Sequence, residues 1–192
     1  MKKSQLDHVL RAARRITGEA EFIIIGSQSL HASFPDVPDT ILMSIEVDLI
    51  AKNERDRTEW LNVIGVDSQF HERFGYYADP VDETTAVVPR GWKDRLVRLG
   101  PGDTDGATGL CLDPHDLAIS KYAARREKDV VFNRELARLG ILHSDKLLDL
   151  LDVTPVSEER KSAIRGYIKA DFAIRPVARR ARGKRQTTRS SR

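Results

Sequence analysis

Residues 22–50 read FIIIGSQSLHASFPDVPDTILMSIEVDLI, and this stretch decides the fold. Its first four residues are an unbroken apolar run that stops at Gly26, a pattern typical of a short strand buried on both faces. Ser27 then opens a predicted short helix. A glycine lets the chain turn tightly, and a serine beside the first free N–H groups of a helix makes a small anion-binding site.

A second strand is predicted over residues 44–50, which carry Glu46 and Asp48 two positions apart. Side chains alternate across a strand, so both carboxylates project from one face while Ile45, Val47 and Leu49 point into a core. Two carboxylates on one strand, beside a Gly-Ser turn that can hold a phosphate, predict a site for a divalent cation carrying a polyphosphate.

The composition indicates an intracellular protein without a membrane partner. Its 192 residues suffice for one medium domain, or for a larger domain with a small appendage. The single cysteine, Cys111, excludes an intrachain disulfide and a zinc cluster, and it is expected to be a small buried hydrophobe. No segment approaches the roughly 20 apolar residues of a membrane span. We therefore expect a cytoplasmic protein.

The net charge of +3 hides an asymmetry between the body of the chain and its end. Residues 175–192 hold seven arginines, one lysine and no acids, which leaves 24 basic and 29 acidic residues for the rest. Such a stretch, without aromatic residues, is most simply a disordered, solvated extension. Salt-sensitive binding of RNA or another polyanion through this tail is the functional alternative.

Strand patterns dominate up to residue 112, and helix patterns follow. The first part is predicted to hold a helix over 4–17, a helix over 54–64 that buries Trp60, Leu61 and Ile64, strands over 84–88, 92–99 and 108–112, and a turn over 100–106. Helices are then predicted from Asp113-Pro114 to about 127, and over 129–139, 144–151 and 157–173. This order predicts an α+β fold with a C-terminal helical subdomain.

Two further features have both a functional and a structural interpretation. Residues 70–79, FHERFGYYAD, gather aromatic and imidazole side chains that can stack a base, or that simply pin a loop to the core. His31, at the end of the predicted short helix, is placed either to reach a substrate or to serve as an ordinary helix-end residue.

With these residues in view, the chain resembles the minimal nucleotidyltransferases of the DNA polymerase β superfamily. Their signature is an apolar strand ending in Gly-Ser or Gly-Gly, a helix, and then a strand bearing acid-hydrophobic-acid; here these elements are Ile25-Gly26-Ser27 and Glu46-Val47-Asp48. More closely, it looks like a prokaryotic group of uncharacterised nucleotidyltransferase-like proteins. The words that carry this resemblance are GSQSL, SIEVDL, FHERFGYYAD, PRGWKDRLV and LDPHDLAISKYAARREKD.

The resemblance implies a polymerase-β-like fold, a small mixed sheet with flanking helices, and a division of the chain into three parts. These are a nucleotidyltransferase-like core over 1–112, a helical subdomain over 113–174 and a basic tail over 175–192. It also implies a nucleoside triphosphate (NTP) substrate and Mg²⁺ or Mn²⁺ held by Glu46 and Asp48. Gly26 and Ser27 would then contact the nucleotide.

A later motif resembles the AbiEii-type toxins of type IV toxin-antitoxin systems, in which a lysine on a helix precedes an Arg-x-x-Arg/Lys-Asp sequence. The matching residues are Lys121, Arg125 or Arg126, Lys128 and Asp129. On one continuous helix, positions 121, 125 and 128 would form a basic stripe able to neutralise a triphosphate. The alternative is a solvated helix face with local ion pairs.

Two departures from the superfamily pattern stand out. The gap between Ser27 and Glu46 is longer than usual, and Glu46 stands where an aspartate is commoner. Many members also carry a third carboxylate on a neighbouring strand, and here the candidates are Asp82, Glu83 and Asp94, with no basis for choosing among them.

The expected activity is transfer of a nucleoside monophosphate from an NTP to an RNA or protein hydroxyl. A toxin role with a cognate antitoxin is the expected setting. Glu46, Asp48 and Lys121 would be catalytic, and Gly26, Ser27, Lys121, Arg125, Lys128 and Asp129 would bind the nucleotide. The alternatives are an inactive nucleotide-binding relative and an RNA-binding protein acting through its tail.

Overall fold

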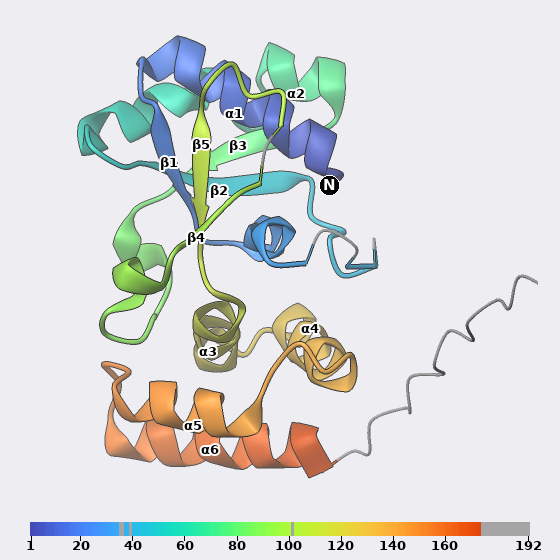
Figure 1. Ribbon diagram of the computed structural model, residues 1–192, viewed down its shortest axis with the longest axis vertical. Coiled ribbons are helices and arrows are strands. Elements are labelled where there is room, and N and C mark those ends of the chain that lie inside the picture. Colours follow the sequence, from blue (N-terminus) through green and yellow to red (C-terminus); the bar gives the residue numbers. More distant parts are fainter. Residues whose placement is uncertain (35–36, 39, 101, 174–192) are drawn as a thin grey trace, which may run out of the picture.

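Five strands form one mixed sheet through the middle of the molecule, between two groups of helices (Figure 1). The computed structural model describes residues 1–34, 37–38, 40–100 and 102–173, so the basic tail predicted over 175–192 lies outside the described residues. Within them, the order across the sheet is β3 (Tyr77–Pro80), β2 (Glu46–Ala51), β1 (Glu21–Ile24), β5 (Thr108–Cys111) and β4 (Val97–Arg98).

The strand pairing brings distant acids together. β1 pairs with β2 antiparallel and with β5 parallel, while β4 and β5 form an antiparallel pair across the predicted turn. β2 and β3 run parallel, with Glu46 opposite Tyr77 and Asp48 opposite Asp79. Paired residues of neighbouring strands share a face of the sheet, so Asp79 lies on the face of the predicted carboxylate pair.

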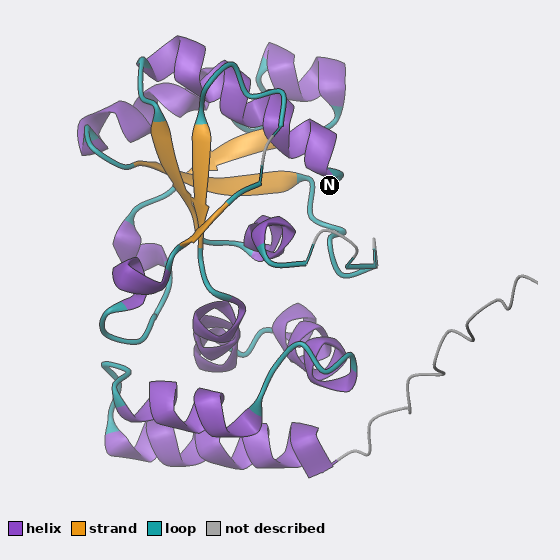
Figure 2. Ribbon diagram, viewed as in Figure 1, coloured by secondary structure: helices purple, strands orange, loops and turns teal. Residues whose placement is uncertain are grey.

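Helices lie on both sides of the sheet (Figure 2), and residues 22–24 of β1 are buried. Phe22 and Ile24 pack with α1 (Lys3–Thr17) and the 3₁₀ helix η2 (Arg55–Ile64). Ile23 and Ile25 pack on the other face with the C-terminal helices. The central strand is therefore buried on both faces, as predicted. α2 (Gln69–Phe74) lies on the α1 side.

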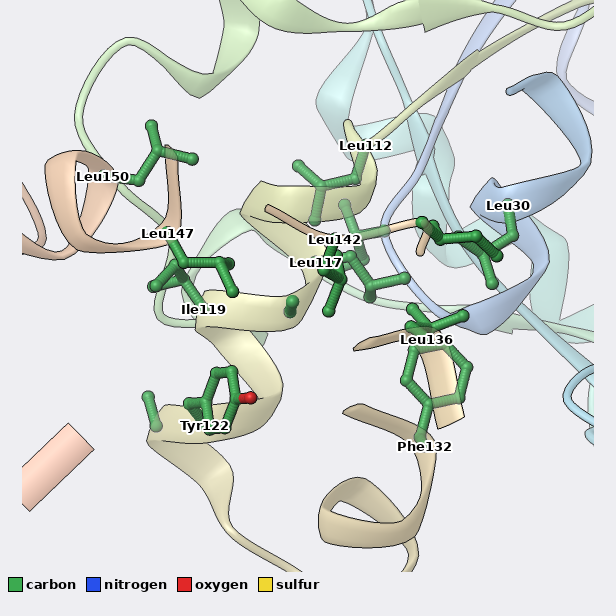
Figure 3. Packing of buried hydrophobic residues seen from close by; sticks show 14 of the residues in the cluster. Leu30, Leu112, Leu117, Ile119, Tyr122, Phe132, Leu136, Leu142, Leu147 and Leu150 are labelled. Carbon is green, nitrogen blue, oxygen red and sulfur yellow. The ribbon is translucent and has the colours of Figure 1, made fainter. Parts of the chain in front are cut away.

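On the other side of the sheet lie four helices: two stand nearer to the sheet, and the other two pack against them on the far side (Figure 1). Their apolar side chains belong to one buried cluster, part of which Figure 3 shows. The four helices are α3 (Pro114–Ala124), α4 (Glu127–Arg138), α5 (Ser144–Asp152) and α6 (Glu158–Ala173). Asp113 caps α3 as predicted, since its side chain accepts a hydrogen bond from the backbone N–H of His115. The protein is thus α+β, with a five-stranded mixed sheet followed by C-terminal helices.

The predicted helix from residue 113 to about 127 is too long. α3 ends at Ala124 because Arg125 adopts a left-handed backbone conformation, with φ of 55°, and α4 begins two residues later. The predicted basic stripe of Lys121, Arg125 and Lys128 on one continuous helix is therefore wrong. The chain turns a corner between the first and last of these residues.

The predicted strand over 84–88 is also wrong. The 3₁₀ helix η3 (Glu83–Thr85) begins there instead, since the Asp82 side chain accepts a hydrogen bond from the Thr84 N–H and favours a turn. Within the predicted strand over 92–99, the 3₁₀ helix η4 (Trp92–Arg95) precedes the short strand β4.

Two residues predicted to be buried are partly exposed. η2 has three residues per turn, which aligns Thr58, Leu61 and Ile64 toward the core and leaves Trp60 52% exposed. Ile45 precedes β2 and is 49% exposed, whereas Val47 and Leu49 are buried as predicted. In the described ranges, no helix is long and apolar enough to cross a membrane.

Candidate functional site

The carboxylate strand forms one wall of a pocket between the sheet and the C-terminal helices. Glu46 and Asp48 line this pocket of about 470 Å³. The opposite wall is basic and comes from the end of α3 and the start of α4, with Lys121, Arg126 and Lys128. Gly26, Ser27 and Asp129 also line the pocket. The fold therefore gathers most of the predicted site residues from three separate parts of the chain.

The glycine at the end of β1 leaves space for the carboxylate of Asp48. A Cβ atom built on Gly26 would lie 1.7 Å from Asp48 Oδ2 and 2.8 Å from its Cγ. Ser27 begins the 3₁₀ helix η1 (Ser27–Ala32), so the predicted short helix is confirmed in 3₁₀ form. The Gly-Ser turn thus has a specific steric role, because it admits the acidic side chain next to the backbone.

Three carboxylates act on one another in this part of the sheet. Burial, with smaller contributions from the charges of Glu46 and Asp79, raises the pKa of Asp48 to about 6. Burial and the charge of Glu46 also raise the pKa of Asp79. The charge of Lys121 works in the opposite direction on Asp48. Added positive charge near Asp48 would favour its ionised form.

Asp79 was missed by the sequence analysis, which considered Asp82, Glu83 and Asp94 as third carboxylates. Asp82 caps η3, Glu83 forms ion pairs with Arg55 and Lys93, and Asp94 is exposed on η4. Asp79 instead stands opposite Asp48 on a parallel strand. The sequence signal for Asp79 is weak: Tyr76 and Ala78 alternate with Tyr77 and Asp79, as inward and outward positions of a strand do. The register that places Asp79 opposite Asp48 depends on the pairing of β2 with β3, which is a tertiary feature.

Lys121 is held in place by two contacts from α4. Its Nζ lies 2.9 Å from Asp129 Oδ1 and 4.4 Å from the centre of the Phe132 ring. Asp129 is only 3% exposed, and its Oδ2 accepts a hydrogen bond from the Arg126 backbone N–H at 3.3 Å. The buried aspartate therefore joins the end of α3 to the start of α4 and fixes the lysine in the pocket wall.

Arg125 takes a different place from its neighbours. Its guanidinium carbon lies 3.4 Å from the centre of the Tyr167 ring on α6, and Arg125 is not among the described residues that line the pocket. Arg126 and Lys128 do line it. Arg125 has the left-handed backbone at the corner, and the two adjacent arginines take different places. Arg125 packs on α6, and Arg126 lines the pocket.

The aromatic run over 70–79 is divided between the two faces of the sheet. Phe70, Phe74 and Tyr76 surround His8 of α1, with ring centres 4.6 to 6.0 Å from the His8 ring. This part of the run pins α2 to α1. Tyr77 instead lies on the carboxylate face and donates a hydrogen bond from its hydroxyl to Glu46 Oε2 at 3.0 Å.

Two other sequence candidates lie away from the pocket lining. His31 is 6% exposed, and its Nε2 lies 3.1 Å from the backbone oxygen of Met1. Cys111 is fully buried, and burial raises the pKa of its thiol to about 12, as fits a small buried hydrophobe. Neither residue lines the pocket within the described part of the chain.

The donor set of the pocket fits a hard cation that is shared with a substrate. Among the residues described, no group of three histidine, cysteine, aspartate or glutamate side chains is arranged to hold a metal ion. Mg²⁺ is usually held by one or two carboxylates, with substrate phosphates and water completing its shell. Glu46 and Asp48 supply such a pair, and the space beside Gly26 brings the Asp48 carboxylate against the turn.

The site lies on a mixed sheet that bears acidic residues on one strand, beside a Gly-Ser turn and facing a basic helix corner. Such a site suits polyphosphate chemistry. Comparison with protein families matches residues 4–165, and the chain belongs to the family described as nucleotidyltransferase of unknown function (DUF6036). It is therefore an enzyme of the nucleotidyltransferase class, and the class implies an NTP substrate. Comparison with curated proteins and with solved structures finds no match.

Proposed function

We propose that this nucleotidyltransferase binds an NTP in the pocket between β2 and the α3–α4 corner, and transfers the nucleoside monophosphate to an RNA or protein hydroxyl. The proposal rests on one observation: an acidic wall and a basic wall face each other across the pocket. Glu46 and Asp48 stand on one, and Lys121, Arg126 and Lys128 on the other. A triphosphate with a divalent cation needs both kinds of wall, since the cation takes carboxylate oxygens and the phosphates take cationic donors.

Glu46 and Asp48 are the residues that would hold Mg²⁺ or Mn²⁺, with Asp79 contributing negative charge beside them. When bound, the cation would neutralise phosphate charge. Ser27 would face the terminal phosphates at the start of η1, and Lys121 would balance charge from the other wall. Asp129 would keep Lys121 in that position, and Gly26 would leave room for the Asp48 side chain.

The reaction is a displacement at the α-phosphorus. The acceptor hydroxyl oxygen forms a bond to that atom, the bond to the bridging oxygen of the β-phosphate breaks, and pyrophosphate leaves. The proton of the hydroxyl passes to water. Catalysis of this kind rests on positioning and charge stabilisation, because phosphoryl transfer needs little covalent chemistry from the protein.

The proposed setting is a toxin of the AbiEii type that is neutralised by a cognate antitoxin. The support is the order of Lys121, Arg126, Lys128 and Asp129 in the chain, together with the Lys121–Asp129 ion pair at the pocket. Induced expression in a bacterial host tests this role. Wild type is expected to arrest growth and Asp48→Asn to be harmless; equal growth of both strains would argue against a toxin.

The activity is tested with the four α-labelled NTPs, Mg²⁺, and total cellular RNA and protein. Wild type and Asp94→Asn, whose changed residue is exposed on η4, are expected to transfer label, whereas Asp48→Asn is not. The labelled polymer would identify the acceptor.

Mg²⁺-dependent NTP binding without transfer would favour an inactive nucleotide-binding relative. A wild-type protein that neither transfers label nor binds NTP, and that loses RNA binding when residues 175–192 are deleted, would favour an RNA-binding protein that acts through its tail.

A further inference from the structure

Glu46 is the more adjustable of the two carboxylates on β2. A glutamate has one more rotatable bond than an aspartate, so fixing its carboxylate costs more side-chain entropy. Asp48 is confined by the backbone at Gly26, where even a Cβ atom would overlap its carboxylate. The Glu46 carboxylate is held by a hydrogen bond instead.

That hydrogen bond comes from the residue directly opposite on the neighbouring strand. Tyr77 pairs with Glu46 in the parallel register of β2 and β3, and its hydroxyl lies 3.0 Å from Glu46 Oε2. The tyrosine hydroxyl is the donor, and Oε2 of Glu46 is the acceptor. Within the described residues, Oε1 of Glu46 has no hydrogen-bond partner. One oxygen is thus occupied, and the other is available to a ligand.

We propose that Tyr77 is the positioning residue of this site: its hydroxyl holds Oε2 of Glu46 and leaves Oε1 to bind the divalent cation. The inference rests on the proposed function, because it assigns Glu46 as a cation ligand. Partners that orient metal-binding carboxylates by hydrogen bonds typically contribute tenfold or more to metal affinity. Tyr77 would act through Glu46 and would not itself touch the substrate.

The tyrosine ring has its own support. The His71 ring of α2 lies 4.6 Å from the Tyr77 ring, and the Asp67 backbone N–H donates to His71 Nδ1 at 3.1 Å. The Ser68 side chain accepts a hydrogen bond from the His71 backbone N–H and caps α2.

The preceding residue provides a matched control. Tyr76 lies on the opposite face of the sheet, where its hydroxyl is 2.9 Å from His8 Nδ1. Tyr76→Phe and Tyr77→Phe each remove one hydroxyl, the first just before β3 and the second at its first residue. The two variants therefore make the same chemical change on different faces.

The test is a titration of the full-length protein with Mn²⁺, followed by the electron paramagnetic resonance signal of free Mn²⁺. We expect Tyr77→Phe to bind Mn²⁺ about tenfold more weakly than wild type, and Tyr76→Phe to bind it as wild type does. In a Glu46→Asp background the shortened side chain no longer reaches the hydroxyl, so Tyr77→Phe should add no further loss. This second comparison separates positioning from a general disturbance of the strand.

Affinity for Mn²⁺ within twofold of wild type in Tyr77→Phe would overturn the inference. So would an equal loss from Tyr77→Phe in the Glu46 and Glu46→Asp backgrounds. Failure of the proposed function would give a different result. If Glu46 is not a cation ligand, Glu46→Gln would bind Mn²⁺ as wild type does. If the pocket takes no cation, wild type itself would not bind Mn²⁺. Thermal unfolding of each variant verifies that it is folded at the titration temperature.

Discussion

A Cβ atom on Gly26 would overlap the carboxylate of Asp48, because it would lie 1.7 Å from Asp48 Oδ2. We predict that Gly26→Ala lowers transferase activity about a hundredfold, because the new methyl group forces the Asp48 carboxylate out of its place. Gly166→Ala on α6, where a Cβ would meet nothing within 4 Å, is the control and should keep full activity. Initial rates of label transfer measure the difference. Full activity in Gly26→Ala would contradict this role for the glycine.

Asp48 also makes the stability of the cation-free protein depend on pH. Its pKa is raised from 3.8 to about 6, so the folded state favours the protonated form. The stability gained from that form is fully present below about pH 4 and is lost as the pH rises through about 6. Charge at this position therefore destabilises the cation-free protein at neutral pH.

We predict that Asp48→Asn unfolds about 3 °C or more above wild type at pH 7.5 in the presence of a chelator, and that the difference shrinks toward zero at pH 4. Asp94→Asn, at an exposed site, should follow wild type at both pH values. Differential scanning calorimetry measures the midpoints. Identical midpoints for Asp48→Asn and wild type at pH 7.5 would show that the buried carboxylate is not strained.

At the scale of elements, the α3–α4 corner distributes its basic residues between two tasks. Arg126 and Lys128 line the pocket, while Arg125 stacks on Tyr167 of α6. Arg125 also has a left-handed backbone, which ends α3 and lets Asp129 fold back onto Lys121. Arg125 therefore has a structural contact at the corner, whereas Arg126 and Lys128 on its α4 side line the pocket together with Lys121 of α3.

Alanine substitutions at the corner test this division. We predict that Arg126→Ala and Lys128→Ala each weaken NTP binding about tenfold, as expected for loss of a charged contact to phosphate. Arg125→Ala should leave NTP binding unchanged and lower stability by about 0.5 to 1 kcal/mol through loss of the stacking contact. Fluorescent nucleotide titration and thermal unfolding measure the two effects. Weaker binding in Arg125→Ala would instead support the nucleotide-binding role predicted from the sequence.

At the scale of the whole molecule, the sheet and the C-terminal helices share one apolar cluster. Ile23 of β1 and Ile25 just after it belong to the same buried cluster as Leu117 of α3 and Leu147 of α5. The pocket lies between these two layers, so its walls keep their spacing only while the layers remain packed. The division at residue 112 that the sequence predicts stays a prediction, and this cluster crosses it.

We therefore predict a single cooperative unfolding transition, in which probes of strand and helix content coincide and the calorimetric and van't Hoff enthalpies agree. Leu117→Ala should lower the unfolding free energy by about 2 to 5 kcal/mol without splitting the transition, because this side chain is 2% exposed at the junction. Two separate transitions in wild type would show that the core and the helical subdomain are independent units.

Local patterns in the sequence determined the elements whose cause is local. The apolar run over 22–25, the glycine and serine after it, and the alternation of Glu46, Val47 and Asp48 each act over a few residues. The Asp113-Pro114 start of α3 is of the same kind. These features predict the α+β class, the two acids and the turn beside them, since hydrophobic period and capping do not depend on distant contacts.

Only the tertiary structure decided which residues complete the site. The register of β2 with β3 placed Asp79 opposite Asp48, and the same pairing brought Tyr77 to Glu46. Lys121 lines the pocket because α3 packs on the sheet face that bears the acids. The left-handed backbone of Arg125 directs its own side chain away from the pocket, whereas the next residue, Arg126, lines it. Strand register and helix packing are set by contacts between residues far apart in the chain, so no local pattern contains them.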